Sequence, residues 1–344
     1  MVELNSRRLV LEAMRGRPPR IPVYFWLAHP ELEARIGDIV GVRCWFKSLE
    51  FLEKGGPFRK GSETRREWCE RLQPDEYEWP DADDLAAEMD RIVAETVKVD
   101  PTKSFQLELL GPTEYSEYSC SPGKTAQGAK LDQISHQFDF SVLTVLDARK
   151  ADLIHKRFFH LLSDVARRAT EYGAIDSIRI ADDFCSYAGS IYRPDFTETL
   201  VQRQVELGRI VTAGGKQSIL HSDGDITKYL ATLGNAYSGF HPLDLRSKST
   251  VADAHEWAAA LEPVRRLLPE SVFFTGIPVD LLCSLEVSAQ ELVDVANHVV
   301  QTVGPDRLVL TTTHRPYPGW RFRDFEEKAL AIKRFSESTR RVPT

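Results

Sequence analysis

The second half of the chain alternates between short apolar runs and longer amphipathic stretches. From about residue 150 onward, five runs of strand character are each followed by a loop and a helical pattern, at 177–181, 217–220, 237–241, 272–276 and 308–313. Two helices are predicted most clearly. Residues 151–172 place apolar residues at helical spacing, and the helix from Ser288 to Gly304 opens with a capping box of Ser288 and Glu291. Such regular alternation is typical of parallel α/β architecture.

The first half of the chain contains two further strand candidates, at 21–27 and 104–110. A polar, aromatic-rich segment from about 40 to 98 separates them, and we interpret it as an insertion. The eighth strand is expected between 111 and 150, where 138–146 fits either a strand or the start of a helix. Because no repeat, low-complexity tract or linker divides the chain, we predict an α/β fold, a (β/α)₈ TIM barrel that forms a single domain over residues 1–344.

Composition and charge narrow the classes of partner. The 344 residues are 42% hydrophobic and carry a net charge of −7, which argues against binding to nucleic acid or to an anionic membrane surface. The chain begins without an apolar signal core and contains no long uninterrupted apolar stretch, so we expect a cytoplasmic protein. Its five cysteines are scattered and form no C-x-x-C pair, which argues against a zinc site made of thiolates.

Four predicted strands end in polar, reactive residues, and the carboxyl ends of the strands are where a (β/α)₈ barrel holds its active site. These strand ends carry Asp182 and Asp183, His221 and Asp223, His241, and His314. A run of four such ends in order points to a site built from several strands.

His221 and Asp223 are the first candidates for metal binding. They lie two residues apart at a strand end, so the pleat directs both side chains to the same side. Together with His314 they would offer two imidazoles and one carboxylate, a set suited to zinc, iron(II) or another divalent first-row metal. In the alternative interpretation, His221 forms a hydrogen bond inside the barrel mouth and Asp223 caps the helix that follows, although Asp225 is better placed for that cap.

The adjacent carboxylates Asp182 and Asp183 cannot both point inward. We assign Asp182 the catalytic role, as a general acid or base, and Asp183 to substrate binding or to a turn. His241 precedes Pro242, and a structural role in that loop competes with a catalytic one.

Two residues of the first half are candidates for substrate binding. Tyr24 lies in the first predicted strand, and Glu108 interrupts the apolar run of the strand at 104–110. A carboxylate inside such a strand is costly unless it is paired, so Glu108 could also serve as a fourth ligand. The alternative is a solvated residue that faces outward.

Segment 253–258 (DAHEWA) approaches the D-x-H-x-x-G loop that ligates cobalt in corrinoid carriers, but alanine replaces the glycine. The chain also contains no GxGxxG motif, Walker loop or G-x-S-x-G elbow. A corrinoid, if one takes part, would therefore be carried by a partner protein.

Several segments resemble the uroporphyrinogen decarboxylase-like superfamily, in the same order along the chain. They are RGRPPRIPVYFW at 15–26, the WPD-containing segment at 78–84, IADDF at 180–184, HSDGD at 221–225, GFHPL at 239–243, GIPVD at 276–280 and the strand end at 310–314. The resemblance implies a (β/α)₈ barrel and two possible activities. Uroporphyrinogen decarboxylases hold their substrate with arginines just after the first strand, and residues 27–29 here contain none.

The second activity of the superfamily is zinc-dependent methyl transfer with a corrinoid protein, for which an H-x-C pair and a later cysteine bind the metal. The resemblance places His221 and Asp223 at the H-x-C positions and His314 near the later one. Losing two thiolates would leave a harder Lewis acid that favours oxygen ligands. We therefore expect methyl transfer between a small O- or N-methylated substrate and a corrinoid protein.

Two alternatives stay open beside methyl transfer. The first is a metal-assisted decarboxylase or lyase that acts on a small carboxylate. The second is a barrel that binds a ligand without chemistry. A homodimer is possible in each case.

Overall fold

Eight parallel strands form one nearly closed barrel in the computed structural model, which describes residues 5–16, 18–46, 56–60, 63–120 and 138–339. The strand order is β1-β10-β9-β8-β7-β4-β3-β2, and every neighbouring pair is parallel. The strands are β1 (Val23–Tyr24), β2 (Ile39–Cys44), β3 (Ser104–Leu110), β4 (Ile175–Ala181), β7 (Gln217–His221), β8 (Gly239–His241), β9 (Val272–Ile277) and β10 (Leu308–Thr312). The predicted (β/α)₈ TIM barrel is therefore confirmed.

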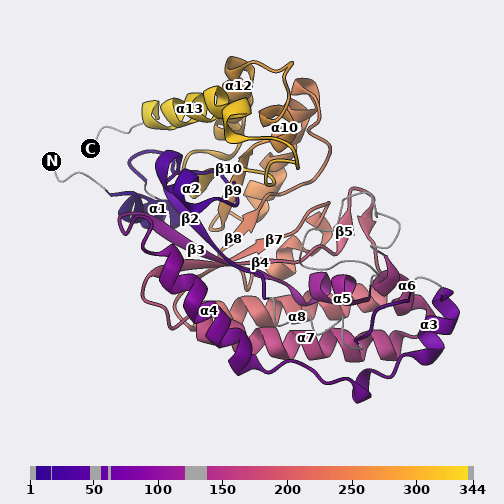
Figure 1. Cartoon of the computed structure of the whole chain (residues 1–344). Coiled ribbons are helices and arrows are strands. Elements are labelled where there is room, and N and C mark those ends of the chain that lie inside the picture. The colour runs from indigo at the N-terminus through magenta and orange to yellow at the C-terminus, as the bar shows by residue number, and fades with distance from the viewer. Residues whose placement is uncertain (1–4, 17, 47–55, 61–62, 121–137, 340–344) are drawn as a thin grey trace.

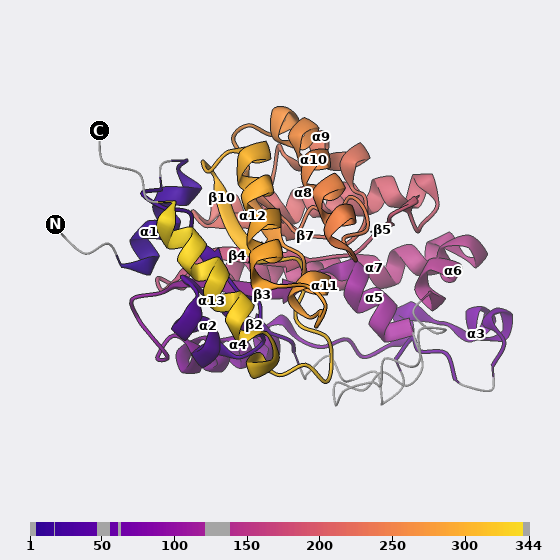
Figure 2. The same cartoon turned by 90° about the horizontal axis from the view of Figure 1, so that it is seen from above.

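Helices surround these strands. Figure 1 shows α10, α12 and α13 on one side of the strands and α4, α7 and α8 on the other, and Figure 2 shows α12 and α13 side by side. The helices are α1 (Ser6–Met14), α2 (Pro30–Ile36), α3 (Arg65–Arg71), α4 (Ala82–Thr96), α5 (Pro112–Cys120), α6 (Asp139–Leu146), α7 (Ala148–Ala169), α8 (Pro194–Ala213), α9 (Leu230–Leu233), α10 (Val251–Leu267), α11 (Val279–Leu282), α12 (Ala289–Val303) and α13 (Phe322–Ser338). A short hairpin, β5 (Cys185–Ser186) and β6 (Gly189–Ser190), follows β4.

Both helices that were predicted most clearly are present, as α7 and α12. Ser288 and Glu291 form the predicted capping box at the start of α12. No helix among the described residues has both the length and the apolar character that crossing a bilayer requires.

The eighth strand is β2, so its expected position between 111 and 150 was wrong. Ile39–Cys44 lies at the start of the segment interpreted as an insertion, and 138–146 instead contains helix α6. The rest of that segment holds α3 and α4, so it is largely the connection from β2 to β3. The strand was missed because Gly41 and Arg43 interrupt its apolar pattern; both lie in a polar layer, where Arg43 pairs with Glu108 of β3.

The apolar core has two parts. The larger part fills the space between the strands and the outer helices. The smaller part lies inside the barrel and consists of Val10, Met14, Tyr24, Trp26, Ile39, Ile219, Val272, Phe274 and Val309. Because Val10 and Met14 belong to α1, this helix closes one end of the barrel. The side chains inside the barrel form a packed core rather than a pore.

The carboxylate of Glu33 joins β1 to β2, the two strands that end the sheet order. It is fully buried on α2 and accepts hydrogen bonds from the backbone N–H groups of Leu27 at 2.8 Å, Ala28 at 3.1 Å and Gly41 at 2.9 Å. The guanidinium of Arg43 also donates to it. One side chain therefore accepts hydrogen bonds from backbone N–H groups that follow β1 and from one in β2. At this junction it takes the place of the backbone carbonyls that pair such groups inside a sheet.

Replacing Glu33 with alanine should destabilise the fold by roughly 3–5 kcal/mol, because it removes one of the two carboxylates that pair with Arg43 and the acceptor of three backbone N–H groups, of which that of Gly41 is buried. Denaturant unfolding measures the loss. Glu31→Ala is the matched control, since Glu31 lies on the same helix with a 68% exposed side chain and pairs with His29 at the surface. We expect that control to cost less than about 1 kcal/mol; equal losses in the two variants would contradict the assigned role of Glu33.

Candidate functional site at the strand ends

Glu108 organises a buried polar layer inside the barrel. Its carboxylate is 3% exposed and accepts hydrogen bonds from Tyr24 Oη at 2.5 Å, Trp26 Nε1 at 3.1 Å and Arg179 Nη2 at 2.8 Å. Arg43 Nε lies 3.2 Å from the same carboxylate. Burial acts to raise the pKa of Glu108, but the two guanidinium groups outweigh it and the pKa is lowered. The carboxylate is therefore ionised, with three protein donors and a second guanidinium beside it.

Glu108 and Tyr24 were both expected to bind substrate. The structure pairs them with each other instead, and Tyr24 is fully buried. Three protein donors and the guanidinium of Arg43 surround the carboxylate of Glu108, and this arrangement favours a role for both residues in positioning Trp26 and Arg179.

Three histidines surround the ring of Trp26. The ring centroids of His221, His241 and His314 lie 5.4, 5.9 and 5.3 Å from it, each in an edge-on arrangement. The guanidinium carbon of Arg179 lies 4.0 Å from the same ring centroid. Trp26 is thus the common surface on which the histidines of β7, β8 and the loop after β10 rest.

His221, Asp223 and Asp183 form the group that could hold a metal ion. One ligand atom from each lies within 4.8 Å of the others. His221 Nε2 lies 3.8 Å from Asp223 Oδ1, and the backbone N–H of Asp223 donates to Asp183 Oδ1 at 2.7 Å. The group arises because β4 and β7 are neighbours whose last residues, Ala181 and His221, stand in register.

His314 was expected to complete this ligand set, but within the described chain it lies outside the group. Its Nδ1 is 2.9 Å from the backbone oxygen of Arg315. Asp183, which was expected to bind substrate or form a turn, is the third member of the group with His221 and Asp223. The donor set therefore has one imidazole and two carboxylates.

Asp182, the expected catalytic residue, belongs to the other side of β4. Its fully buried carboxylate accepts hydrogen bonds from Thr113 Oγ1 at 2.7 Å, from the Glu114 N–H at 2.9 Å and from Gln204 Nε2. These donors come from α5 and α8. Burial raises the pKa of Asp182 to about 7, with the hydrogen bonds from Glu114 and Thr113 acting against it. Asp183, and not Asp182, therefore lies with His221 and Asp223.

The pleat of β4 explains this arrangement. Arg179 lies inside the barrel against Trp26, and residues two and four positions later share its side of the strand. Asp183 lies four positions after Arg179 and so shares its side of the strand. Asp182 lies three positions after Arg179 and so points to the opposite side. The sequence could have predicted that Asp183 points inward only if Arg179 had been expected inside the barrel.

Lys248 is a residue of the site that the sequence did not indicate. It is 4% exposed, forms an ion pair with Asp244, and its Nζ lies 5.7 Å from the ring centroid of Trp257. Burial lowers the pKa of Lys248 to about 8, while the nearby carboxylates of Asp223 and Asp280 act in the opposite direction. Lys248 therefore places a titratable ammonium near Asp223. A lysine in a polar loop is ordinarily exposed, so its position in the sequence gave no signal.

The residues of this group fit a divalent cation. Burial raises the pKa of both Asp183 and Asp223, and the carboxylate of Asp183 raises that of Asp223 further. Two carboxylates this close to each other are stabilised by a shared cation. One nitrogen and two oxygen ligands suit zinc, iron(II) or manganese, and they leave positions open for water or substrate.

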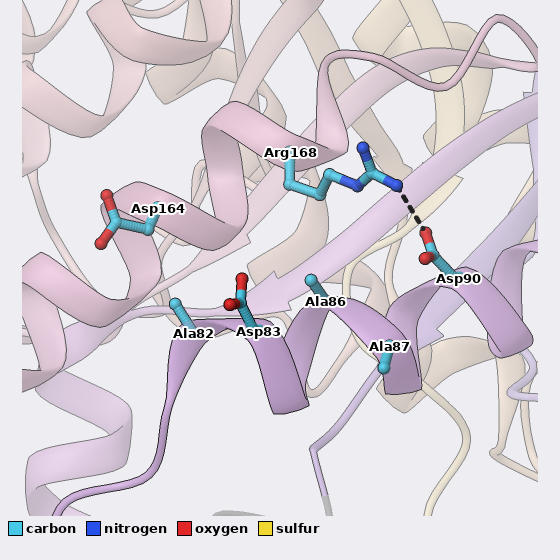
Figure 3. A pocket seen from close by; sticks show the side chains of 7 residues that line it. All are labelled: Ala82, Asp83, Ala86, Ala87, Asp90, Asp164 and Arg168. Atoms are coloured by element: carbon cyan, nitrogen blue, oxygen red, sulfur yellow. Dashed lines mark hydrogen bonds and ion pairs between the residues drawn. The ribbon is translucent and has the colours of Figure 1, made fainter.

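A separate hollow of about 340 Å³ lies on the outer helical layer, between α4 and α7. Figure 3 shows the ion pair that crosses it, in which Arg168 Nη2 lies 3.5 Å from Asp90. None of the residues expected to form the active site lines this hollow.

Comparison with known proteins leaves the family of the chain open. No protein-family model matches it, and no curated protein matches it. Among solved structures, it is similar to a B12-independent methionine synthase from Shewanella sp. W3-18-1 in complex with selenomethionine, with a TM-score of 0.44 and 13% sequence identity over 77% of this chain and 68% of that chain. A similarity this distant supports neither a family nor an activity. The strand order thus defines the class, a (β/α)₈ barrel, and the superfamily resemblance stays a prediction.

The assignment of the two aspartates can be tested by stability. Asp182→Asn should destabilise the protein by about 1–3 kcal/mol, because an amide NH₂ replaces an oxygen that faces only donors. Asp183→Asn keeps an oxygen for the Asp223 N–H and should cost less than about 1 kcal/mol. Denaturant unfolding in the presence of a chelator measures both variants. The reverse order of stabilities would show that Asp182 is not the structural member of the pair.

Proposed function

We propose that the chain is a metal-dependent enzyme that acts on a small oxygen-bearing substrate at the carboxyl ends of its strands, with methyl transfer between an O- or N-methylated substrate and a corrinoid protein as the reaction. The observation that carries the proposal is the convergence of Asp183, His221 and Asp223, with ligand atoms within 4.8 Å of one another. The resemblance of the HSDGD segment to the H-x-C metal site of corrinoid methyltransferases favours methyl transfer among the reactions such a site supports.

Each residue of the site has a role in this proposal. His221 Nε2 and one carboxylate oxygen each from Asp183 and Asp223 would hold the ion. When bound, the metal would act as a Lewis acid that polarises an oxygen or nitrogen of the substrate. Trp26 fixes the ring of His221, and the side chain of Asp223 is 37% exposed, so the ligand group opens to solvent on its side.

A ligand group without sulfur favours some substrates over others. All five cysteines are buried and none belongs to the ligand group. Carboxylate ligands donate less charge than thiolates, so the ion they hold prefers hard oxygen donors. This favours a methylated oxygen or nitrogen compound over a thiol as the small substrate.

Lys248 favours a second candidate, a decarboxylase or lyase that acts on a small carboxylate. Its buried ammonium, with a pKa lowered to about 8, could bind a substrate carboxylate or deliver a proton to a carbanion formed near Asp223. Methyl transfer from an O-methyl compound to Co(I) also consumes a proton, on the oxygen that leaves, but water can supply that proton on the exposed side of Asp223.

Metal binding tests the ligand set. The chelator-treated protein should bind Zn²⁺, and Asp183→Ala, His221→Ala and Asp223→Ala should each weaken binding by about 100-fold or more, since loss of an outer partner alone typically costs 10–100-fold. His314→Ala is the matched control, because His314 also packs against Trp26 but lies outside the group. Competition with a zinc-binding dye measures the affinities. If His314→Ala were as damaging as His221→Ala, the set His221, Asp223 and His314 would be right instead.

Turnover separates the candidate reactions. The zinc-loaded protein is mixed with a corrinoid protein in its Co(I) state and a panel of small O- and N-methyl compounds, and the absorbance of methyl-cobalt is followed. We expect it to form with the wild type and not with His221→Ala. Lys248→Met should then keep methyl transfer largely intact. Release of CO₂ from small carboxylates, with loss of that release in Lys248→Met, would support the lyase, and ligand binding without turnover would support the non-catalytic barrel.

A further inference from the structure

His221 and His241 face one another from neighbouring strands. They are register partners in β7 and β8, so their side chains leave the sheet side by side. Their Nδ1 atoms lie 2.5 Å apart, and their ring centroids are 4.8 Å apart. At that distance one Nδ1 must carry a proton and the other must accept it.

The partner on the far side of His241 decides which nitrogen carries the proton. His241 Nε2 lies 3.0 Å from the backbone oxygen of Thr312, and a carbonyl oxygen can only accept. His241 therefore has its proton on Nε2. Both rings are buried, and both pack against Trp26, whose ring also carries the guanidinium of Arg179, so a further positive charge on either imidazole is unfavourable and both are neutral. A neutral His241 with a proton on Nε2 has a bare Nδ1, and His221 must donate to it from its own Nδ1.

From this chain of hydrogen bonds we infer that His241 is a positioning residue that holds His221 in its Nδ1–H tautomer, so that the lone pair of His221 Nε2 faces Asp183 and Asp223. The inference rests on the proposed function in one respect, because the lone pair is useful only if the group binds a metal. His241 itself does not belong to the ligand group. It acts as the outer partner that a metal-binding histidine ordinarily has, here an imidazole in place of the usual carboxylate or carbonyl.

The alternative tautomer shows why this partner matters. With its proton on Nε2, His221 would point an N–H at Asp223 Oδ1, 3.8 Å away, and would have no lone pair to offer a cation there. Trp26 packs edge-on against both imidazoles, which opposes a ring flip that would exchange the two nitrogens. The geometry thus selects one nitrogen of His221 for the site.

Side-chain ¹⁵N spectra of the metal-free protein test the tautomers directly. With ¹⁵N-labelled histidine, the spectra should show a Nδ1–H neutral imidazole for His221 and a Nε2–H neutral imidazole for His241, with His221→Ala and His241→Asn used to assign the signals. This measurement needs no metal, so it stands whether or not the proposed function does. Finding His221 in the Nε2–H form at neutral pH would overturn the inference.

Zinc affinity tests the consequence. His241→Leu removes the acceptor, and we expect it to weaken zinc binding 10–100-fold. His241→Asn places an amide oxygen on Cγ, where Nδ1 stood, and should restore most of that loss. Equal affinities in the wild type and His241→Leu, or equal losses in the two variants, would overturn the positioning role. A wild type that binds no zinc would instead count against the proposed function, and the ¹⁵N spectra would still decide the tautomers.

Discussion

The site depends on one buried carboxylate, that of Glu108. Inside the barrel it binds Arg179, Trp26 and Tyr24, and it pairs with Arg43 of the neighbouring strand. An ionised carboxylate in this position is stable only because two guanidinium groups and two further donors replace its water. The pairing fixes Trp26, and Trp26 in turn supports His221, His241 and His314. The histidines therefore rest, through Trp26, on a charged layer centred on Glu108.

Much of the fold could be predicted from the sequence, because most strands are apolar runs followed by helical patterns. The strand β2 could not, since Gly41 and Arg43 belong to the polar layer and break the apolar alternation on which the prediction depends. Its neighbour β3 was predicted even though Glu108 lies within it, because one phenylalanine and three leucines flank that residue in the strand.

The candidate site was predicted in part. His221 and Asp223 were brought together by the pleat, a local rule that needs only their spacing. Choosing between Asp182 and Asp183 required knowing which side of β4 faces the inside of the barrel. Deciding whether His314 belongs to the ligand group required knowing the path of the loop after β10. Lys248 is buried by contacts with Trp257 and Asp244, which depend on how that loop folds. Local spacing therefore predicts pairs, while the complete set depends on tertiary structure.

The most direct test of this account is a crystal structure of the zinc-supplemented protein with anomalous diffraction at the zinc edge. We expect one ion bound by His221 Nε2 and by oxygens of Asp183 and Asp223, with nitrogen and oxygen ligands at about 2.0–2.2 Å and no sulfur. An ion bound by His314 or by a cysteine, or one that contacts His221 through Nδ1, would contradict the account.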